Sequence, residues 1–415
     1  MNEKIREIKG GVASAGGFAA AGVQAGIKYK NRKDMAMVYS KTPCRVAGTF
    51  TTNVVKAACV LWDREIVEES LHGESKVHAV VVNAGIANAC TGSQGYDNCA
   101  KTARAAADAL GIGEKEVLVA STGVIGMQLP VEKLKNGASR LASLLKEGEA
   151  AGTQAAQSIM TTDTYAKEAA VEFEIGGKTV TLGGMCKGSG MIHPNMCTML
   201  AFLTTDLAIS KELLAEALRE NVEETFNMVS VDGDTSTNDT LLLLANGMAG
   251  NPEIREKNEE YDCFREALLI LNTKLAKMLA GDGEGATALI EVQVDHADTK
   301  ENARRLAKSV IGSSLTKAAI FGHDANWGRI LCALGYAGVA FDPEKIAVSF
   351  GGSKETVLIF EDGVAADYSE ETAASILSEP EVRILVDMKM GGESACAWGC
   401  DLTYDYVKIN ADYRS

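Results

Sequence analysis

One threonine stands where its hydroxyl could act as a nucleophile. Thr198 opens an apolar run that continues to Leu203, and it directly follows a small residue, Cys197. A threonine hydroxyl attacks an acyl carbon only when a base takes its proton. If the chain were cut between Cys197 and Thr198, the new α-amine, with a pKa of about 7.7–8, would be a suitable base. A β-branched residue that simply opens a strand is the commoner interpretation.

A second candidate is the pair Thr122 and Gly123, which follows a short buried strand predicted at 117–120. A hydroxyl and a backbone N–H that point at one spot can stabilise the negative oxygen of an acyl-transfer intermediate. The alternative is an ordinary turn between a strand and a loop.

Two charged residues lie in glycine-rich segments. Lys187 is predicted to lie in a turn at 183–190, and Glu284 lies in the loop 281–287. Glycine allows a ligand or another backbone to approach closely. The alternatives are an exposed lysine and a solvated acid, which either segment alone would favour.

Alternating strands and helices must position these residues. Short, β-branched runs predict buried strands, and apolar residues at helical spacing predict amphipathic helices. Ser210 is expected to cap the helix that follows it. The first sixty residues are glycine- and alanine-rich and then β-rich, with apolar runs at 35–39 and 58–62. Further strands are predicted at 77–83, 117–120, 170–175, 179–182, 198–203, 241–244, 286–294, 346–350, 357–360 and 382–388, and helices at 97–110, 131–145, 210–222, 261–280 and 301–311.

The order of these elements predicts an α/β or α+β fold. Several strands are adjacent in sequence, which favours mixed sheets with helices packed outside them. No repeat of fixed period and no long linker divides the chain, so composition alone sets no domain boundary. The terminal segment 399–415 has enough apolar and aromatic residues to predict that it docks on the fold.

Composition narrows the classes of function. The chain has 415 residues and a formal charge of −15, from 41 basic and 56 acidic side chains. A nucleic-acid partner is therefore not expected, because phosphate contacts need basic patches. No apolar signal segment or membrane span is visible, and the ten dispersed cysteines form no zinc-binding pattern. We expect a soluble, cytoplasmic protein with reduced cysteines and no metal.

Several segments together resemble one family. The run KGSGMIHPNMCTML at 187–200 resembles the self-cleavage signature of the ArgJ family, the ornithine acetyltransferases (glutamate N-acetyltransferases). The resemblance covers essentially the whole chain. Its other segments are 48–56, 83–92, 121–126, 160–164, 230–239, 322–329 and 409–414.

The resemblance implies a self-cleaving acetyltransferase. The chain would cut itself between Cys197 and Thr198 into an α chain, 1–197, and a β chain, 198–415. Thr198 would take the acetyl group of N2-acetyl-L-ornithine and pass it to L-glutamate, in ping-pong kinetics. Thr122 and Gly123 match the oxyanion hole. The matching substrate-binding positions are Thr161, Lys187, Thr198, Glu284, Asn410 and Ser415.

The resemblance also implies a fold, an assembly and a cofactor requirement. The fold is a layered α-β-β-α sandwich of the DmpA/ArgJ-like type with a C-terminal α/β lobe. The assembly is an α2β2 heterotetramer, and no cofactor is needed. Whether acetyl-CoA is a second donor stays open. Cys197 stands where the family usually has alanine, and Ser415 keeps a hydroxyl where threonine is also common.

Two other classes of function are compatible with parts of this pattern. An autoprocessed N-terminal-nucleophile aminopeptidase or amidase would use the same residues with water in place of glutamate. A binding protein without chemistry would use the cleft alone, but it would not need Thr198, Lys187 and the Thr122–Gly123 pair together.

Overall fold

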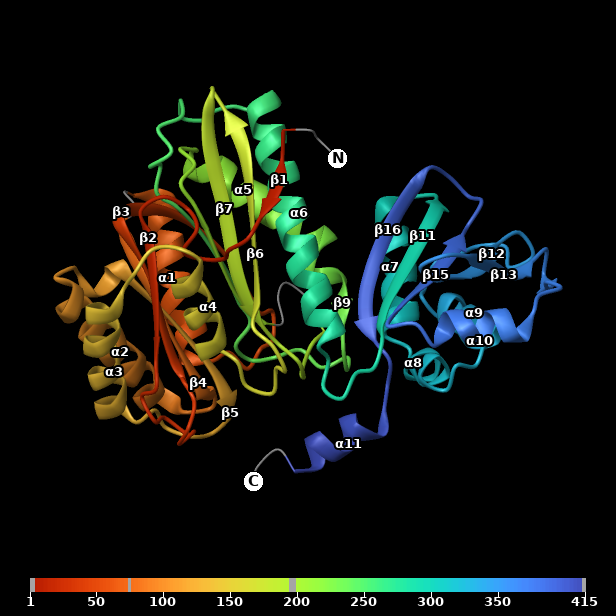
Figure 1. The fold of residues 1–415 in the computed structure, drawn as a ribbon, viewed down its shortest axis with the longest axis horizontal. Helices are drawn as coiled ribbons and strands as arrows, with labels where there is room; N and C mark the ends of the chain where they lie inside the picture. The colour runs from red at the N-terminus through yellow and green to blue at the C-terminus, as the bar shows by residue number, and fades with distance from the viewer. Residues whose placement is uncertain (1–3, 74–75, 194–198, 413–415) are drawn as a thin grey trace. The chain divides into compact units, whose positions relative to one another are not determined.

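The computed structural model describes residues 4–73, 76–193 and 199–412. The chain divides into two compact units, which are interleaved in sequence (Figure 1). Unit 1 comprises residues 1–188, 195–223 and 235–275, and unit 2 comprises 189–194, 224–234 and 276–415.

Unit 1 is built on one long, bent sheet, which has nine strands among the described residues. Its central strand is β3, whose first half pairs with β2 and β4 and whose second half pairs with β10. The order along the sheet is β1-β6-β7-β8-β10-β3-β4-β5, with β2 beside β3. The strands are β1 (Arg6–Ile8), β2 (Phe18–Val23), β3 (Met35–Phe50), β4 (Val77–Ile86), β5 (Val117–Val124), β6 (Lys167–Ile175), β7 (Lys178–Lys187), β8 (Leu200–Thr205) and β10 (Thr240–Ala245).

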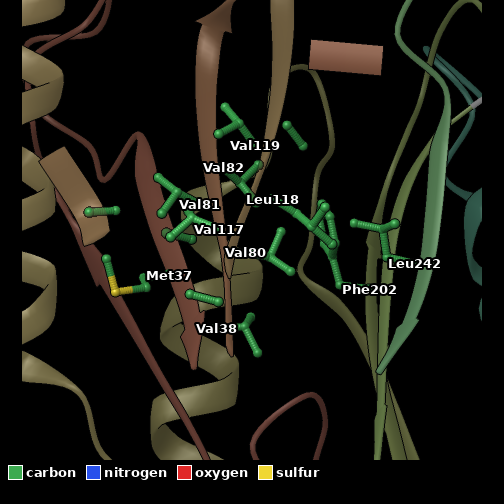
Figure 2. Packing of buried hydrophobic residues seen from close by; sticks show 14 of the residues in the cluster. Met37, Val38, Val80, Val81, Val82, Val117, Leu118, Val119, Phe202 and Leu242 are labelled. Atoms are coloured by element: carbon green, nitrogen blue, oxygen red, sulfur yellow. The ribbon is translucent and has the colours of Figure 1, made fainter. Parts of the chain in front are cut away.

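The core of unit 1 collects side chains from both halves of this sheet. Strands β4 and β5 are almost continuously apolar, as parallel strands covered on both faces usually are. They contribute Val80, Val81 and Val82 from β4 and Val117, Leu118 and Val119 from β5, all labelled in Figure 2. Phe202 of β8 and Leu242 of β10 come from the other half of the sheet and belong to the same buried cluster. The two halves therefore share one apolar interior.

Helices cover the outer sides of unit 1. Helices α1 and α2 contact β5, and α3 and α4 contact β2 and β3. On the other half, the ring of Phe264 in α6 lies 6.4 Å from that of Phe173 in β6. The helices that begin in unit 1 are α1 (Ala58–His72), α2 (Gly92–Leu110), α3 (Val131–Leu144), α4 (Glu149–Ser158), α5 (Lys211–Glu224) and α6 (Glu259–Gly281). This arrangement confirms the predicted layered sandwich.

Unit 2 contains a second sheet, of seven strands among the described residues, in the order β14-β13-β12-β15-β11-β16-β9. Helix α7 packs on β11 and β16. The strands are β9 (Val229–Ser230), β11 (Leu289–Ala297), β12 (Ala347–Gly351), β13 (Thr356–Glu361), β14 (Val364–Ala365), β15 (Glu381–Asp387) and β16 (Glu393–Cys400). The helices are α7 (Lys300–Ile311), α8 (Ser314–Phe321), α9 (Trp327–Gly335), α10 (Glu370–Leu377) and α11 (Tyr404–Ala411). Unit 2 is the predicted C-terminal α/β lobe.

Two local predictions were wrong. Residues 58–62 are not part of a β-rich segment but begin helix α1, because Trp62, Ile66 and Val67 continue the buried pattern at helical spacing. Gly183 and Gly184 do not form a turn and lie inside strand β7. A Cβ on Gly183 would come within 2.1 Å of the Gly11 carbonyl oxygen, so the glycine serves close packing.

The predicted cap of the helix after Ser210 was correct. The Ser210 hydroxyl accepts the Leu213 N–H at 3.3 Å and caps α5. In unit 2 the terminal segment is attached before α11, where the Thr403 hydroxyl donates to the Gly285 carbonyl at 2.8 Å. Helix α11 itself has no buried residue, and Tyr404 and Val407 are exposed, so the docking expected from its apolar and aromatic residues does not extend along the helix. No described helix combines the length and the apolar character that crossing a bilayer requires.

Candidate active site

Three predicted site residues, Cys197, Thr198 and Ser415, lie outside the described residues. The described chain resumes at Met199, whose carbonyl accepts the Thr240 N–H at 2.9 Å. Strand β8 begins at Leu200, within the strand predicted at 198–203. The candidate nucleophile therefore directly precedes, in sequence, a segment held by the central sheet of unit 1.

The candidate oxyanion residues, Thr122 and Gly123, lie near the end of strand β5. Gly123 has a φ of 129°, a conformation that residues with a side chain rarely adopt. It is the register partner of Gly85 in β4. A Cβ on Gly123 would lie 2.2 Å from the Gly85 carbonyl carbon and 2.4 Å from its oxygen. Glycine is therefore required at both the backbone angle and the contact.

Lys187 is the final residue of β7 and is buried, with 8% of its surface exposed. Its ammonium donates to the Thr122 hydroxyl at 3.2 Å. Strands β7 and β5 are not neighbours in the sheet, so the fold brings these two side chains together across the unit. The sequence motifs predict both site residues but not their contact.

Thr161 lies in the same unit, and its backbone is held by the carboxylate of Asp163. Asp163 was not among the predicted site residues. Asp163 accepts the Thr161 N–H at 2.9 Å and the Gly188 N–H at 2.8 Å. It also accepts the ammonium of Lys167 at 2.7 Å, and both side chains of this pair are fully buried. The signal in the sequence was an aspartate and a lysine four residues apart at the start of a buried strand.

Two buried carboxyls lie in the electrostatic field of Lys187, and their pKa values move in opposite directions. Burial acts to raise the pKa of Asp163, but the charges of Lys187 and Lys167 outweigh it and leave that pKa lowered. Burial raises the pKa of Asp239 well above its usual range, against the hydrogen bonds of Ser236 and Thr51. The two lysines therefore favour the ionised form of Asp163, whereas burial favours the neutral form of Asp239.

In unit 2 the structure brings Glu284 and Asn410 together. Glu284 is buried, and its carboxylate accepts the Asn410 amide at 2.7 Å. Its backbone N–H donates to the Ser189 carbonyl at 2.9 Å. A Cβ on Gly190 would come within 2.3 Å of the Glu284 carboxylate, so this glycine makes room for the acid.

Each unit, taken by itself, offers side chains suited to a charged group. The buried ammonium of Lys187 suits a carboxylate, and the carboxylate of Glu284 suits an ammonium group. Thr122 and Gly123 can stabilise an oxyanion. Among the described residues, no cluster of histidine, cysteine, aspartate or glutamate side chains is arranged to hold a metal ion.

A layered α/β sandwich with a buried lysine beside a candidate oxyanion hole fits an enzyme of the acyl-transfer class. The ArgJ family model matches residues 19–415, and this chain belongs to the ArgJ family. It is an acyltransferase, and the aminopeptidase or amidase alternative is not favoured.

Two named relatives match this chain over nearly its whole length. The arginine biosynthesis bifunctional protein ArgJ of Symbiobacterium thermophilum is 51% identical over 98% of this chain and 99% of its own length. ArgJ 1 of Clostridium acetobutylicum is 50% identical over 96% of both chains. A solved ArgJ structure from Bacillus halodurans is 44% identical and covers 51% of this chain and 97% of its own, with a TM-score of 0.49.

Proposed function

We propose that this protein transfers the acetyl group of N2-acetyl-L-ornithine to L-glutamate through an acetyl-Thr198 intermediate. Membership of the ArgJ family supports an acetyl-transfer role in arginine biosynthesis. The observation that carries the site assignment is the contact of the buried Lys187 ammonium with Thr122, at 3.2 Å. This contact places Lys187, which can bind a substrate carboxylate, beside Thr122 of the candidate oxyanion hole.

The first half-reaction begins with Thr198 at the start of the β chain. Its α-amine takes the proton of its hydroxyl, and the hydroxyl oxygen attacks the acetyl carbonyl carbon. Thr122 and the Gly123 N–H stabilise the resulting oxyanion. The C–N bond then breaks, the proton passes to the leaving amine, and ornithine departs from acetyl-Thr198.

The second half-reaction reverses these roles. The α-amine of glutamate attacks the ester carbonyl, the C–O bond to Thr198 breaks, and the proton returns to the threonine oxygen. Lys187 and Thr161 bind the carboxylate side of each substrate in this scheme. Glu284, Asn410 and Ser415 bind the side-chain ammonium end of acetylornithine in this scheme, where Asn410 orients the Glu284 carboxylate.

Self-cleavage is tested with Thr198→Ala and the matched variant Thr198→Ser. We expect two bands of nearly equal size from the wild type and one full-length band from Thr198→Ala on a denaturing gel. Thr198→Ser keeps a hydroxyl and is expected to be cut. A wild-type protein that stays whole and fully active would refute the mechanism.

The transfer itself is tested with purified protein and acetylornithine. Formation of acetylglutamate that depends on glutamate supports the proposal. Release of acetate alone, at a rate independent of glutamate, would instead support a hydrolase.

We further propose an α2β2 assembly without a cofactor, in the cytoplasm. Native mass spectrometry tests the assembly. Incubation of glutamate with acetyl-CoA as the sole donor tests whether acetyl-CoA is a second co-substrate.

A further inference from the structure

The buried carboxylate of Asp163 binds the backbone next to two candidate substrate residues, Thr161 and Lys187. The Oδ2 of Asp163 accepts the N–H of Thr161, and its Oδ1 accepts the N–H of Gly188, the residue after Lys187. Asp163 thereby connects the loop between α4 and β6 to the end of β7. Two candidate substrate residues of unit 1, Thr161 and Lys187, lie on the two segments that it joins.

A carboxylate in this place needs compensation for the loss of water. Burying an ion costs several kcal/mol unless a partner and hydrogen bonds offset the cost. Lys167 supplies the partner, since its ammonium lies 2.7 Å from Oδ1 and the pair has no solvent-exposed side-chain surface. The two backbone N–H groups supply the hydrogen bonds.

The charge of Lys167 leaves the positive charge of Lys187 available to a substrate. Lys167, Lys187 and Asp163 together carry a net charge of +1, and the burial of Asp239 favours its neutral form. Without Lys167, the same cluster would be neutral, and Lys187 would be the nearby cation that compensates Asp163. With Lys167 present, the cluster retains one positive charge, which is what a single substrate carboxylate needs.

We propose that Asp163 is a positioning residue for Thr161 and Lys187 and that Lys167 is its dedicated counter-ion. This inference rests on the proposed function, because it assigns Lys187 to substrate binding. Neither Asp163 nor Lys167 touches substrate in this scheme. Both act through the backbone and the charge of the residues that do.

The test compares Asp163→Asn, Lys167→Gln and the double variant. Asp163→Asn keeps one acceptor oxygen and replaces the other by a donor, so one backbone anchor is lost. Loss of a hydrogen bond to a charged group corresponds to about a 10- to 100-fold effect. We expect KM for acetylornithine and for glutamate to rise by about that factor, with kcat per acylatable site reduced much less. The number of acylatable sites is measured from the ornithine burst.

Lys167→Gln removes the charge and keeps a donor group on a side chain that is one atom shorter. A smaller rise in KM is expected, and this variant decides the matter if Asp163→Asn does not fold. The double variant should resemble Asp163→Asn alone, because Lys167 acts through the charge of Asp163. Multiplication of the two single effects would overturn the counter-ion role.

Two controls separate the possible failures. Glu7→Gln removes an acid from the exposed Glu7–Lys274 pair in the same unit, and we expect unchanged KM. If Lys187→Met also leaves KM unchanged, the proposed role of Lys187 fails. If Lys187→Met raises KM while Asp163→Asn and Lys167→Gln lower only thermal stability, the positioning role alone fails.

Discussion

Substituting Gly123 tests the candidate oxyanion hole most directly. Alanine at a φ of 129° costs about 1–3 kcal/mol in backbone strain. Its Cβ would also lie 2.2 Å from the Gly85 carbonyl carbon, which is backbone and cannot rotate away. Strands β4 and β5 must therefore separate locally, and this movement shifts the Gly123 N–H. Loss of one oxyanion donor costs about 10²- to 10³-fold in kcat.

We therefore expect Gly123→Ala to lower kcat for acetyl transfer by about two to three orders of magnitude, measured as acetylglutamate formed per cleaved chain. The matched control is Gly126→Ala. Gly126 also has a positive φ, 86°, but a Cβ there would meet nothing within 4 Å. It carries the strain without the collision. Equal kcat losses in the two variants, or a Gly123→Ala enzyme with wild-type kcat, would refute the assignment.

The remaining predictions concern stability and the Glu284 site. Burial raises the pKa of Asp63 well above its usual range, while the Val119 N–H opposes the rise. The folded protein therefore keeps a proton that the unfolded chain releases above about pH 4, so Asp63 makes stability fall as the pH rises. The free energy of unfolding, measured with urea, should fall less between pH 5 and pH 8 for Asp63→Asn than for the wild type. An equal fall in both proteins would contradict this. Asn410→Ala removes the amide that orients Glu284 and should raise KM for acetylornithine about three- to tenfold, because the bond is charge-assisted but partly exposed. An unchanged KM would exclude Asn410 from the site.

The fold was predictable where burial leaves a simple pattern. The strands at 77–83 and 117–120 were found because parallel strands buried on both faces form short, β-branched runs. The helix that starts at residue 58 was missed, because its first residues form an apolar run without visible periodicity. Glycines in β7 indicated a turn in the sequence, and only the packing against Gly11 shows why a strand needs them.

The site residues that lie in short sequence motifs could be predicted from the sequence. Thr122, Gly123 and Lys187 stand out in short motifs, yet their meeting depends on non-neighbouring strands of a bent sheet. Asp163 and Lys167 could not be assigned from the sequence. A charged pair at a spacing of four residues is usually a surface pair, and only burial shows that this one is structural to the site.

The sheet of unit 1 also explains how the chain can be cut without losing this arrangement. The proposed cut separates β7 from β8, but these strands remain hydrogen-bonded in antiparallel register, with Lys187 opposite Leu200. In the same way β10, from the second product, pairs with β3 of the first, from Thr240 opposite Phe50 to Ala245 opposite Arg45. Backbone ladders and a shared apolar core thus join the two products, because both halves of the sheet contribute to one buried cluster. The ladder, rather than the peptide bond at Thr198, fixes the position of Lys187 relative to the start of β8.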